Sequence, residues 1–455
     1  MYKDARSAMN PAGVNRRGFL KAVGAGAAAV AMVPRVWAAE APHAPGGKEY
    51  FIAPKAGSGA GTAADPFGLA DLPDNSSDQL RSKALEALQP GDTLSFRQGD
   101  YRLATLEGKY YWLGHIRTAR PGLPDRRITI RAHPGETVRL IHAGGGQPML
   151  GGGQFVTFEG FFIEAGPHAA ARIGGTGMEI AYCQIKGQFI DTVDNHDGIR
   201  IEKCEGCRIH HCDISGVQGK SSNSAGIKLY TTSNAIIEDN YIHDNYTGIF
   251  DKDSGINNTY RRNYITANRL QFDGRIQGKI ARFIIHDNVI GGQVSLHCGT
   301  DGCEIRNNLL RSDTLAGGWA GGVLNNSIFN NIVISGGKPI LAFYDHRVVW
   351  GGDKANLQYM DQNLYDGPPA YSFGQYSATP SRFTLAEIRE KGFERNSQVL
   401  AGAAAIFEDE KNWRLRPALA KAGKDGAAPG PANIAEVLDL GRYGPSGRGR
   451  KAGAG

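Results

Sequence analysis

The chain of 455 residues carries a formal net charge of +6, but this charge is concentrated at its two ends. Residues 1–39 contribute +5 and the tail after Gly444 contributes +3, which leaves −2 for residues 40–443. The overall charge therefore gives no argument for a nucleic-acid partner, and we predict none. Attraction for an anionic ligand must come from a local patch.

The N-terminal segment has the three parts of an export signal. The basic stretch NRRGFLK (15–21) precedes an apolar run over 22–33, and small residues follow at Ala38 and Ala39. The apolar run is too short to span a bilayer, so we predict no stable membrane span. The paired arginines resemble a twin-arginine signal, although Asn15 stands where Ser or Thr is usual. The resemblance implies a signal peptide over 1–39, recognition by the twin-arginine export machinery, and a periplasmic or secreted bacterial protein.

After the signal, the sequence predicts a strand followed by a Gly/Ala loop within 50–67. Apolar residues at helical spacing then predict a helix over 76–88, which Pro90-Gly91 ends. Short strands are expected at 93–96 and 127–131.

The middle of the chain repeats itself. The repeat reads GIRIEKCEGCRIHHCDIS from Gly198, GIKLYTTSNAIIEDNYIHDN from Gly226 and GIFDKDSGINNTYRRNYITAN from Gly248. Each copy is a β-branched strand, a polar turn and a second strand that carries Cys or Asn two residues before Ile. The same position recurs at Gly160, Cys183, Cys212, Asn240, Asn263, Asn288, Asn308, Asn331 and Asn363. Steps of 20 to 32 residues between these positions are typical of stacked units that bury their apolar faces against their neighbours.

The recurring Asn has a physical reason, because Asn tolerates a left-handed bend and its amide can bond the amides stacked above and below it. With this asparagine ladder, residues 48–420 resemble the right-handed parallel β-helix proteins of the pectate-lyase type. The resemblance implies an all-β, single-stranded right-handed parallel β-helix (solenoid) of about nine coils over 126–366. It also implies a helical N-terminal cap over 40–125. Proteins of this type are secreted and mostly bind, cleave or epimerise acidic polysaccharides, so the resemblance implies a function of that kind.

The C-terminal part is expected to close the solenoid over 367–443 without a second domain. A helix is predicted over 384–391, followed by an extended closing stretch. Residues 444–455, GPSGRGRKAGAG, are of low complexity and are predicted to be disordered.

Six cysteines suggest two uses. Cys183 and Cys212 occupy the inward ladder position as small apolar residues. Pairs that flank turns could form two disulfides in an oxidising compartment, Cys204 with Cys207 and Cys298 with Cys303. A zinc site from Cys204, Cys207, His210, His211 and Cys212 is less favoured, because strand alternation should send the two histidines to opposite faces.

The first strand of each repeat offers an outward face across successive coils. If Ile199, Ile227 and Ile249 point inward, one outward column reads Arg200, Lys228, Phe250, Arg275 and Ser295. The next column reads Glu202, Tyr230, Lys252, Gln277 and His297. This mixture of cations with Tyr and His is unlike a random solvated face.

Such a face suits elimination or epimerisation of a uronic-acid polymer, since removal of the C5 proton requires neutralisation of the adjacent carboxylate. A lysine crowded by cations is a reasonable base. The resemblance to pectate lyases implies Lys228 and Lys252 as candidate bases and Arg275 as carboxylate clamp or acid, with Asp197 and Glu202 as Ca²⁺ ligands. Tyr230 is a candidate base, proton donor or stacking platform. Arg200, Gln277 and His297 are candidate substrate-binding residues.

Other interpretations stay open. The cations could be ordinary surface residues, and Lys252 could simply pair with Asp251 or Asp253. A register slip of one residue would turn both aspartates outward as Ca²⁺ ligands and Lys252 inward. Polygalacturonase-type hydrolysis is an alternative because NHDGIRI (195–201) resembles the strand-edge Asp of those enzymes. A non-catalytic carbohydrate-binding solenoid is the remaining alternative.

Overall fold

The computed structural model describes residues 47–72, 82–103, 115–142, 150–166, 169–190, 195–219, 223–274, 279–297, 299–311, 315–318, 322–335, 338–345, 348–374 and 379–443. The chain divides into two units, Met1–Arg35 and Val36–Gly455. The predicted signal peptide and the predicted disordered tail both lie outside the described residues.

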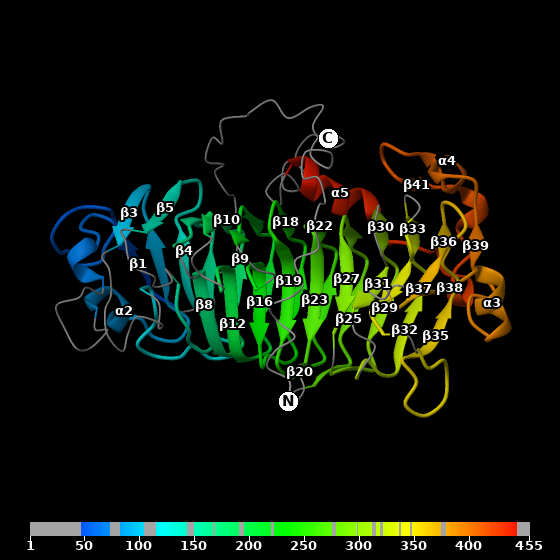
Figure 1. Ribbon diagram of the computed structural model, residues 1–455. Coiled ribbons are helices and arrows are strands. Elements are labelled where there is room, and N and C mark those ends of the chain that lie inside the picture. Colours follow the sequence, from blue (N-terminus) through cyan, green and yellow to red (C-terminus); the bar gives the residue numbers. More distant parts are fainter. Residues whose placement is uncertain are drawn as a thin grey trace. The chain divides into compact units, whose positions relative to one another are not determined.

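Successive coils of the second unit build three long sheets, which we call A, B and C (Figure 1). Within the described residues, sheets A and B each have twelve strands, all paired in parallel, and sheet C has ten strands. This confirms the right-handed parallel β-helix. The stack is longer than the nine coils that the ladder positions predicted, because the terminal coils lack the repeated Cys or Asn.

The strands of sheet A are β1 (Glu49–Ile52), β2 (Thr93–Phe96), β4 (Ile128–Ala132), β6 (Val156–Glu159), β9 (Glu179–Ala181), β13 (Arg208–His210), β17 (Ile236–Glu238), β21 (Thr259–Arg261), β25 (Ile284–His286), β29 (Glu304–Arg306), β32 (Asn326–Phe329) and β35 (Leu357–Asp361). The strands of sheet B are β3 (Gly99–Leu103), β5 (Val138–His142), β7 (Phe162–Glu164), β10 (Gln184–Lys186), β14 (Asp213–Ser215), β18 (Tyr241–His243), β22 (Tyr264–Thr266), β26 (Val289–Ile290), β30 (Leu309–Arg311), β33 (Ile332–Ile334), β36 (Leu364–Tyr365) and β39 (Gln398–Val399).

The strands of sheet C are β8 (Ala169–Thr176), β12 (Asp197–Glu205), β16 (Ala225–Tyr230), β19 (Thr247–Lys252), β23 (Arg269–Asp273), β27 (Gln293–Leu296), β31 (Ala316–Gly318), β34 (Leu341–Phe343), β37 (Tyr371–Phe373) and the antiparallel β38 (Ser381–Phe383). Smaller sheets pair β11 (Phe189–Ile190) with β15 (Gln218–Gly219), β20 (Gly255–Ile256) with β24 (Ile280–Ala281) and β28 (Thr300–Asp301), and β40 (Phe407–Asp409) with β41 (Arg414–Leu415).

The core is a set of columns in which one inward residue per strand stacks on its equivalent in the next coil. One column of sheet A contains Ile180, Ile209, Ile237, Tyr260, Ile285 and Ile305, all fully buried. Stacking like residues at equivalent positions lets each coil bury apolar surface that it could not bury alone.

The predicted asparagine ladder is present at the bend between sheets A and B. The Asn240 amide nitrogen donates to Asn263 Oδ1 at 3.0 Å, and Asn263 donates in the same way to Asn288 at 3.0 Å. The pattern continues through Asn308 and Asn331 to Asn363. Upstream, the equivalent residue is Phe161 and not Gly160, because Ile163 pairs with Ile185 and places the ladder position two residues earlier.

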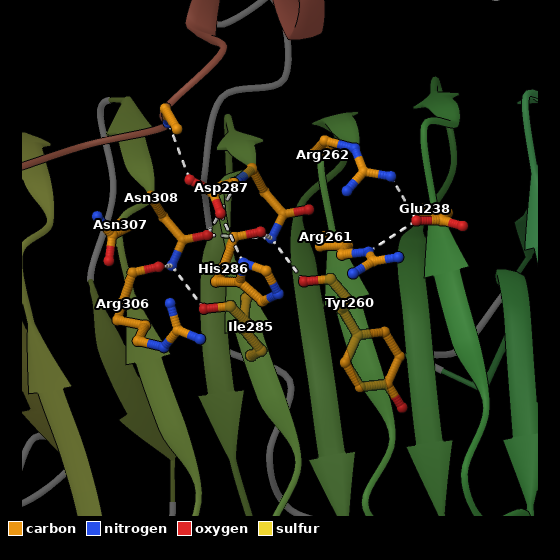
Figure 2. A network of polar contacts seen from close by, with 12 residues as sticks. Glu238, Tyr260, Arg261, Arg262, Ile285, His286, Asp287, Arg306, Asn307 and Asn308 are labelled. Atoms are coloured by element: carbon orange, nitrogen blue, oxygen red, sulfur yellow. Dashed lines mark hydrogen bonds and ion pairs between the residues drawn. The ribbon is translucent and has the colours of Figure 1, made fainter.

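The outward side chains of sheet A form ion pairs across coils. Figure 2 shows Arg261 and Arg262 directed at Glu238, whereas Tyr260 of the same strand as Arg261 points away from that carboxylate. Arg208 also pairs with Glu238, at 2.5 Å. Burial alone would raise the pKa of Glu238, but the bonds from its arginines lower it to about 2.

The N-terminal region contributes both strands and a helix to the stack. The 3-10 helix η1 (Leu69–Asp71) and helix α2 (Lys83–Ala87) lie before β2. Ser82 caps α2 by accepting a hydrogen bond from the Leu85 amide at 3.2 Å, so the described helix is shorter than the one predicted over 76–88.

The C-terminal region begins with helix α3 (Leu385–Glu390), which confirms the predicted helix and starts in a capping box between Thr384 and Glu387. Helices α4 (Ala403–Ile406) and α5 (Ile434–Tyr443) and 3-10 helices η3 (Pro417–Leu419) and η4 (Lys424–Gly426) follow. Helix α5, which was not predicted from the sequence, packs against β22 and β26 of sheet B (Figure 1). Val437 and Leu438 there join a second apolar cluster with Val289 and Leu309.

The cysteines behave only partly as predicted. Cys204 and Cys207 form a disulfide, and Cys183 and Cys212 are buried free thiols. Cys303 is also a buried free thiol, and its expected partner Cys298 lies outside the described residues.

The two histidines do not point to opposite faces, which corrects that part of the zinc argument. His211 has a φ of 53°, which ends the strand alternation and brings its Nδ1 to 2.8 Å from His210 Nδ1. In the described parts of the chain, no group of three or more His, Cys, Asp or Glu side chains is arranged to hold a metal ion. No helix among the described residues is long and apolar enough to cross a membrane.

Candidate active site on sheet C

The register of sheet C tests the two predicted outward columns. Arg200 aligns with Lys228 and then with Phe250, and Glu202 aligns with Tyr230 and then with Lys252, as predicted. On the next strand, however, the aligned residues are Gln271 and Asp273. Arg275 and Gln277 therefore do not occupy these columns, and both lie outside the described residues.

The correction has a local cause. Only Ala267 and Asn268 separate β22 from β23, so the sheet C strand begins at Arg269, earlier than the sequence pattern suggested. Ser295 does lie in the predicted column with Arg200, Lys228 and Phe250, because it aligns with Gln271.

The centre of the candidate site is a buried ion-paired group on two adjacent coils. Lys228 Nζ lies 2.7 Å from Asp197 Oδ1, and both side chains are 0% exposed. Arg200 Nη2 lies 2.6 Å from the other oxygen, Asp197 Oδ2. Burial lowers the pKa of Arg200, but the Asp197 carboxylate outweighs burial and raises it overall. One carboxylate thus holds two cations side by side.

The rings of Tyr230 and Phe250 alternate with Lys228 and Lys252 beside this ion-paired group. Lys228 Nζ lies 5.9 Å from the ring centre of Tyr230 and 5.8 Å from that of Phe250. Lys252 Nζ lies 5.6 and 5.1 Å from the same two rings. Arg200 is 5.6 Å from the Tyr230 ring. Because strands β16 and β19 pair in register, these four residues alternate cation and aromatic ring on two coils.

Two asparagines that were not predicted from the sequence, Asn195 and Asn223, accept hydrogen bonds from the side chains of the site. Asn195 Oδ1 accepts from the Tyr230 hydroxyl at 3.2 Å and from Lys228 at 3.4 Å. Asn223 Oδ1 accepts from Lys252 at 3.0 Å, and its carbonyl accepts from Lys228. The sequence did contain a signal for this pair, because Asn195 and Asn223 each stand two residues before an aligned position, Asp197 or Ala225.

Arg172, also missed, extends the cation column by one coil because it aligns with Arg200. Its Nε donates to Glu202 Oε2 at 3.1 Å, and Arg200 Nη1 lies 3.8 Å from the other oxygen of Glu202. The two predicted Ca²⁺ ligands, Asp197 and Glu202, thus already bind cationic side chains. As arranged, they do not fit a divalent-cation site.

Asp251 faces the interior of the solenoid. It aligns with Leu229 and Phe272 and is 0% exposed, whereas Lys252 stays on the outer face. The one-residue slip that would have made Asp251 an outward Ca²⁺ ligand therefore does not occur.

His297 lies beyond the end of β27, with β23 between that strand and Lys252 on β19. Its Nε2 is 3.0 Å from Ser295 Oγ, and burial lowers the pKa of the imidazole. The contacts described for His297 do not join it to the group around Lys228.

Residues 149–333, which include every described residue of this site, match the family model for a right handed beta helix region. The match covers less than half of the chain and agrees with the right-handed parallel β-helix fold of the described residues. Comparison with curated proteins gave no match.

Several solved structures resemble the fold at low identity. They include pectate lyase Pel9A (13% identity, TM-score 0.41, 65% of this chain and 76% of that chain). A mannuronic acid specific polysaccharide family 6 lyase from human gut microbiota matches at 15% identity and a TM-score of 0.37, over 87% of this chain and 99% of that chain. The GH136 lacto-N-biosidase from Eubacterium ramulus matches at 11% identity and a TM-score of 0.37, over 68% of each chain. Similarity this distant carries no argument about activity.

Proposed function

We propose that this protein is a polysaccharide lyase or C5-epimerase that acts on an acidic, uronic-acid-containing polysaccharide at the sheet C site. The observation that carries the proposal is the Asp197–Lys228–Arg200 group directly beside Tyr230 and Lys252. A fixed group of cations supplies what proton removal next to a carboxylate requires, because it stabilises negative charge without having to reorganise.

The contacts suggest different roles for the two lysines. Asp197 holds Lys228 and Arg200 side by side, so we assign these two cations to neutralising the substrate carboxylate. Lys252 donates to the neutral amide of Asn223 and shares two aromatic rings with Lys228. Lys252 is the less buried of the two lysines and lies beside Tyr230, so we assign it as the base.

In elimination, Lys252 removes the C5 proton, the electron pair forms the C4=C5 double bond, and the C4–O bond breaks. Tyr230 supplies a proton to the leaving oxygen. In epimerisation, the C4–O bond stays intact and a proton returns to the opposite face of C5. Tyr230 is only half-buried whereas Lys228 is fully buried, so substrate would meet Tyr230 before Lys228.

The test is incubation of the exported protein with alginate, pectate, glucuronan and glycosaminoglycans, with and without Ca²⁺. Elimination is followed by the ultraviolet absorbance of the unsaturated product, and epimerisation by exchange of the C5 proton with solvent. We expect Lys252→Ala to lower kcat by about 10²–10⁴-fold and Tyr230→Phe to lower it by about 10²-fold.

Matched controls are Lys186→Ala on β10 of sheet B and Tyr182→Phe at the bend after β9, and both should leave kcat unchanged. Reducing ends without an unsaturated product would instead support the hydrolase. Binding without any product would support the non-catalytic carbohydrate-binding solenoid. Loss of activity on Ca²⁺ removal would mean that the metal binds with rearrangement of Asp197 and Glu202.

We also propose that the protein works in the periplasm or outside the cell after twin-arginine export. The proposal rests on residues 1–39 alone. Replacing Arg16 and Arg17 together by Lys should retain the protein in the cytoplasm, and unchanged delivery would indicate a general secretory route.

A further inference from the structure

One carboxylate interrupts the apolar interior directly beneath the proposed active site. In the inward column of sheet C, Asp251 stands between Leu229 and Phe272 and is fully buried. Within the described residues, the groups that hydrogen-bond it are neutral, namely the Tyr260 hydroxyl, the Asn258 amide and the Lys252 backbone amide, and no Lys, Arg or His side chain pairs with it. Such a group is unfavourable for stability compared with Leu, so its presence requires another explanation.

Asp251 is the centre of a buried polar cluster. Its Oδ2 accepts from the Tyr260 hydroxyl at 2.6 Å and from the Asn258 amide nitrogen at 2.9 Å. The same Asn258 nitrogen donates to the Thr232 carbonyl at 2.9 Å, and Asn258 Oδ1 accepts from the Ala235 backbone amide at 2.9 Å. The cluster therefore ties strand β19 to the turn that follows β16.

That turn begins immediately after Tyr230. Thr232 Oγ1 donates to the Tyr230 carbonyl at 3.1 Å, and the Thr231 amide donates to the Lys252 carbonyl at 3.3 Å. Tyr230 and Lys252 are the last residues of β16 and β19, and they align with each other. Strand ends move more readily than strand centres, so these two side chains depend on what anchors the strand ends.

We propose that Asp251, acting through Asn258 and Tyr260, is a positioning residue that fixes Tyr230 and Lys252 in their reactive arrangement. The kinetic consequence rests on the proposed function, whereas the structural consequence does not. Burial, partly opposed by the Tyr260 and Asn258 hydrogen bonds, raises the pKa of Asp251 to about 7, as expected for a carboxyl kept in an apolar interior.

The test compares Asp251→Leu with Asp251→Asn. Leu matches the apolar column but accepts no hydrogen bond, and Asn keeps an acceptor for Tyr260 and Asn258. We expect Asp251→Leu to lower kcat by about 10- to 100-fold at unchanged KM, with some loss of melting temperature because the buried Tyr260 hydroxyl loses its acceptor. We expect Asp251→Asn to restore most of kcat. Phe272→Leu is the matched control in the same column, and it should lower the melting temperature while leaving kcat intact.

If Asp251→Leu does not fold, Tyr260→Phe removes a single donor and keeps the ring, and it should lower kcat in the same way. A readout independent of activity is the ¹³C NMR signal of the Tyr230 ring, which should shift or broaden in Asp251→Leu and Tyr260→Phe but not in Phe272→Leu. Wild-type kcat together with an unchanged Tyr230 signal in both variants would overturn the inference. If the wild-type protein acts on no uronate polymer, the proposed function fails, and the Tyr230 signal still decides the positioning role.

Discussion

The corner between sheets A and B and the outer face of sheet C are built on the same coils but follow opposite rules. At the corner, Asn263 and its neighbours repeat one residue, and each amide satisfies the next at about the same distance, 3.0 to 3.1 Å. On sheet C, equivalent positions hold different residues, such as Arg200, Lys228 and Phe250.

The comparison shows how a repetitive fold separates stability from chemistry. A repeated polar residue needs only another copy of itself as a partner, so the ladder continues from Asn240 to Asn363 without bringing unlike functional groups together. A column of unlike residues instead brings different functional groups within reach of one another, and it requires partners such as Asp197 to make the buried charges tolerable.

Removing Lys228 should have the largest effect on the free energy of unfolding. Lys228→Met breaks the buried pair with Asp197 and leaves that carboxylate paired with Arg200, and breaking a buried pair costs about 3–5 kcal/mol. Urea unfolding measures the loss. The double variant Asp197→Asn with Lys228→Met removes both charges of this pair but leaves Arg200 with Glu202 at 3.8 Å, so it should recover only part of the loss. A loss below about 1 kcal/mol in the single variant would show that water reaches Asp197.

A break in the ladder should have the next largest effect. Asn263→Ala removes the acceptor used by the Asn240 backbone and side-chain amides, together with the donor to Asn288. Each buried polar group left unpaired costs about 1–3 kcal/mol, so we expect a loss of about 3 kcal/mol in urea unfolding. The exposed Asn412→Ala should change stability by at most about 0.5 kcal/mol. Equal effects of the two variants would contradict the ladder's structural role.

The smallest expected effect per residue is a dependence of stability on pH that comes from two buried acids, Asp251 beneath the sheet C face and Glu394 at the end of the ladder. Burial raises the pKa of Asp251 and that of Glu394, which closes the ladder through Asn363, to about 7. Both values lie above those of the unfolded chain, so the folded state keeps protons that the unfolded state releases. The free energy of unfolding should therefore fall as pH rises from about 4 to 7, by about 2 kcal/mol per group between pH 5 and 7.

Asp251→Asn and Glu394→Gln should each remove one group's share of this slope, and the double variant should remove both. The measurement is the urea midpoint at several pH values. A slope unchanged in Asp251→Asn would mean that its carboxyl is ionised and hydrated in the folded protein.

The sequence predicted the parts of the fold that repeat and the parts of the site that lie within one strand. The Asn positions, the inward Ile residues and the alignment of Arg200 with Lys228 all followed from a period read along the chain. The same reasoning misplaced Arg275, because the connection between β22 and β23 is only two residues long and one shifted strand changes the whole column.

The solenoid, its ladder and the face that carries the cations could therefore be predicted from the sequence, since they depend on local alternation and on a residue that recurs at one position of successive coils. The three-dimensional arrangement was needed to show that Asp197 holds both Lys228 and Arg200, that Asn195 and Asn223 accept hydrogen bonds from the site, and that Asp251 lies inside beneath it. These contacts join residues of different coils across variable turns. Their distances depend on how the coils stack, and a pattern along one strand does not contain that information.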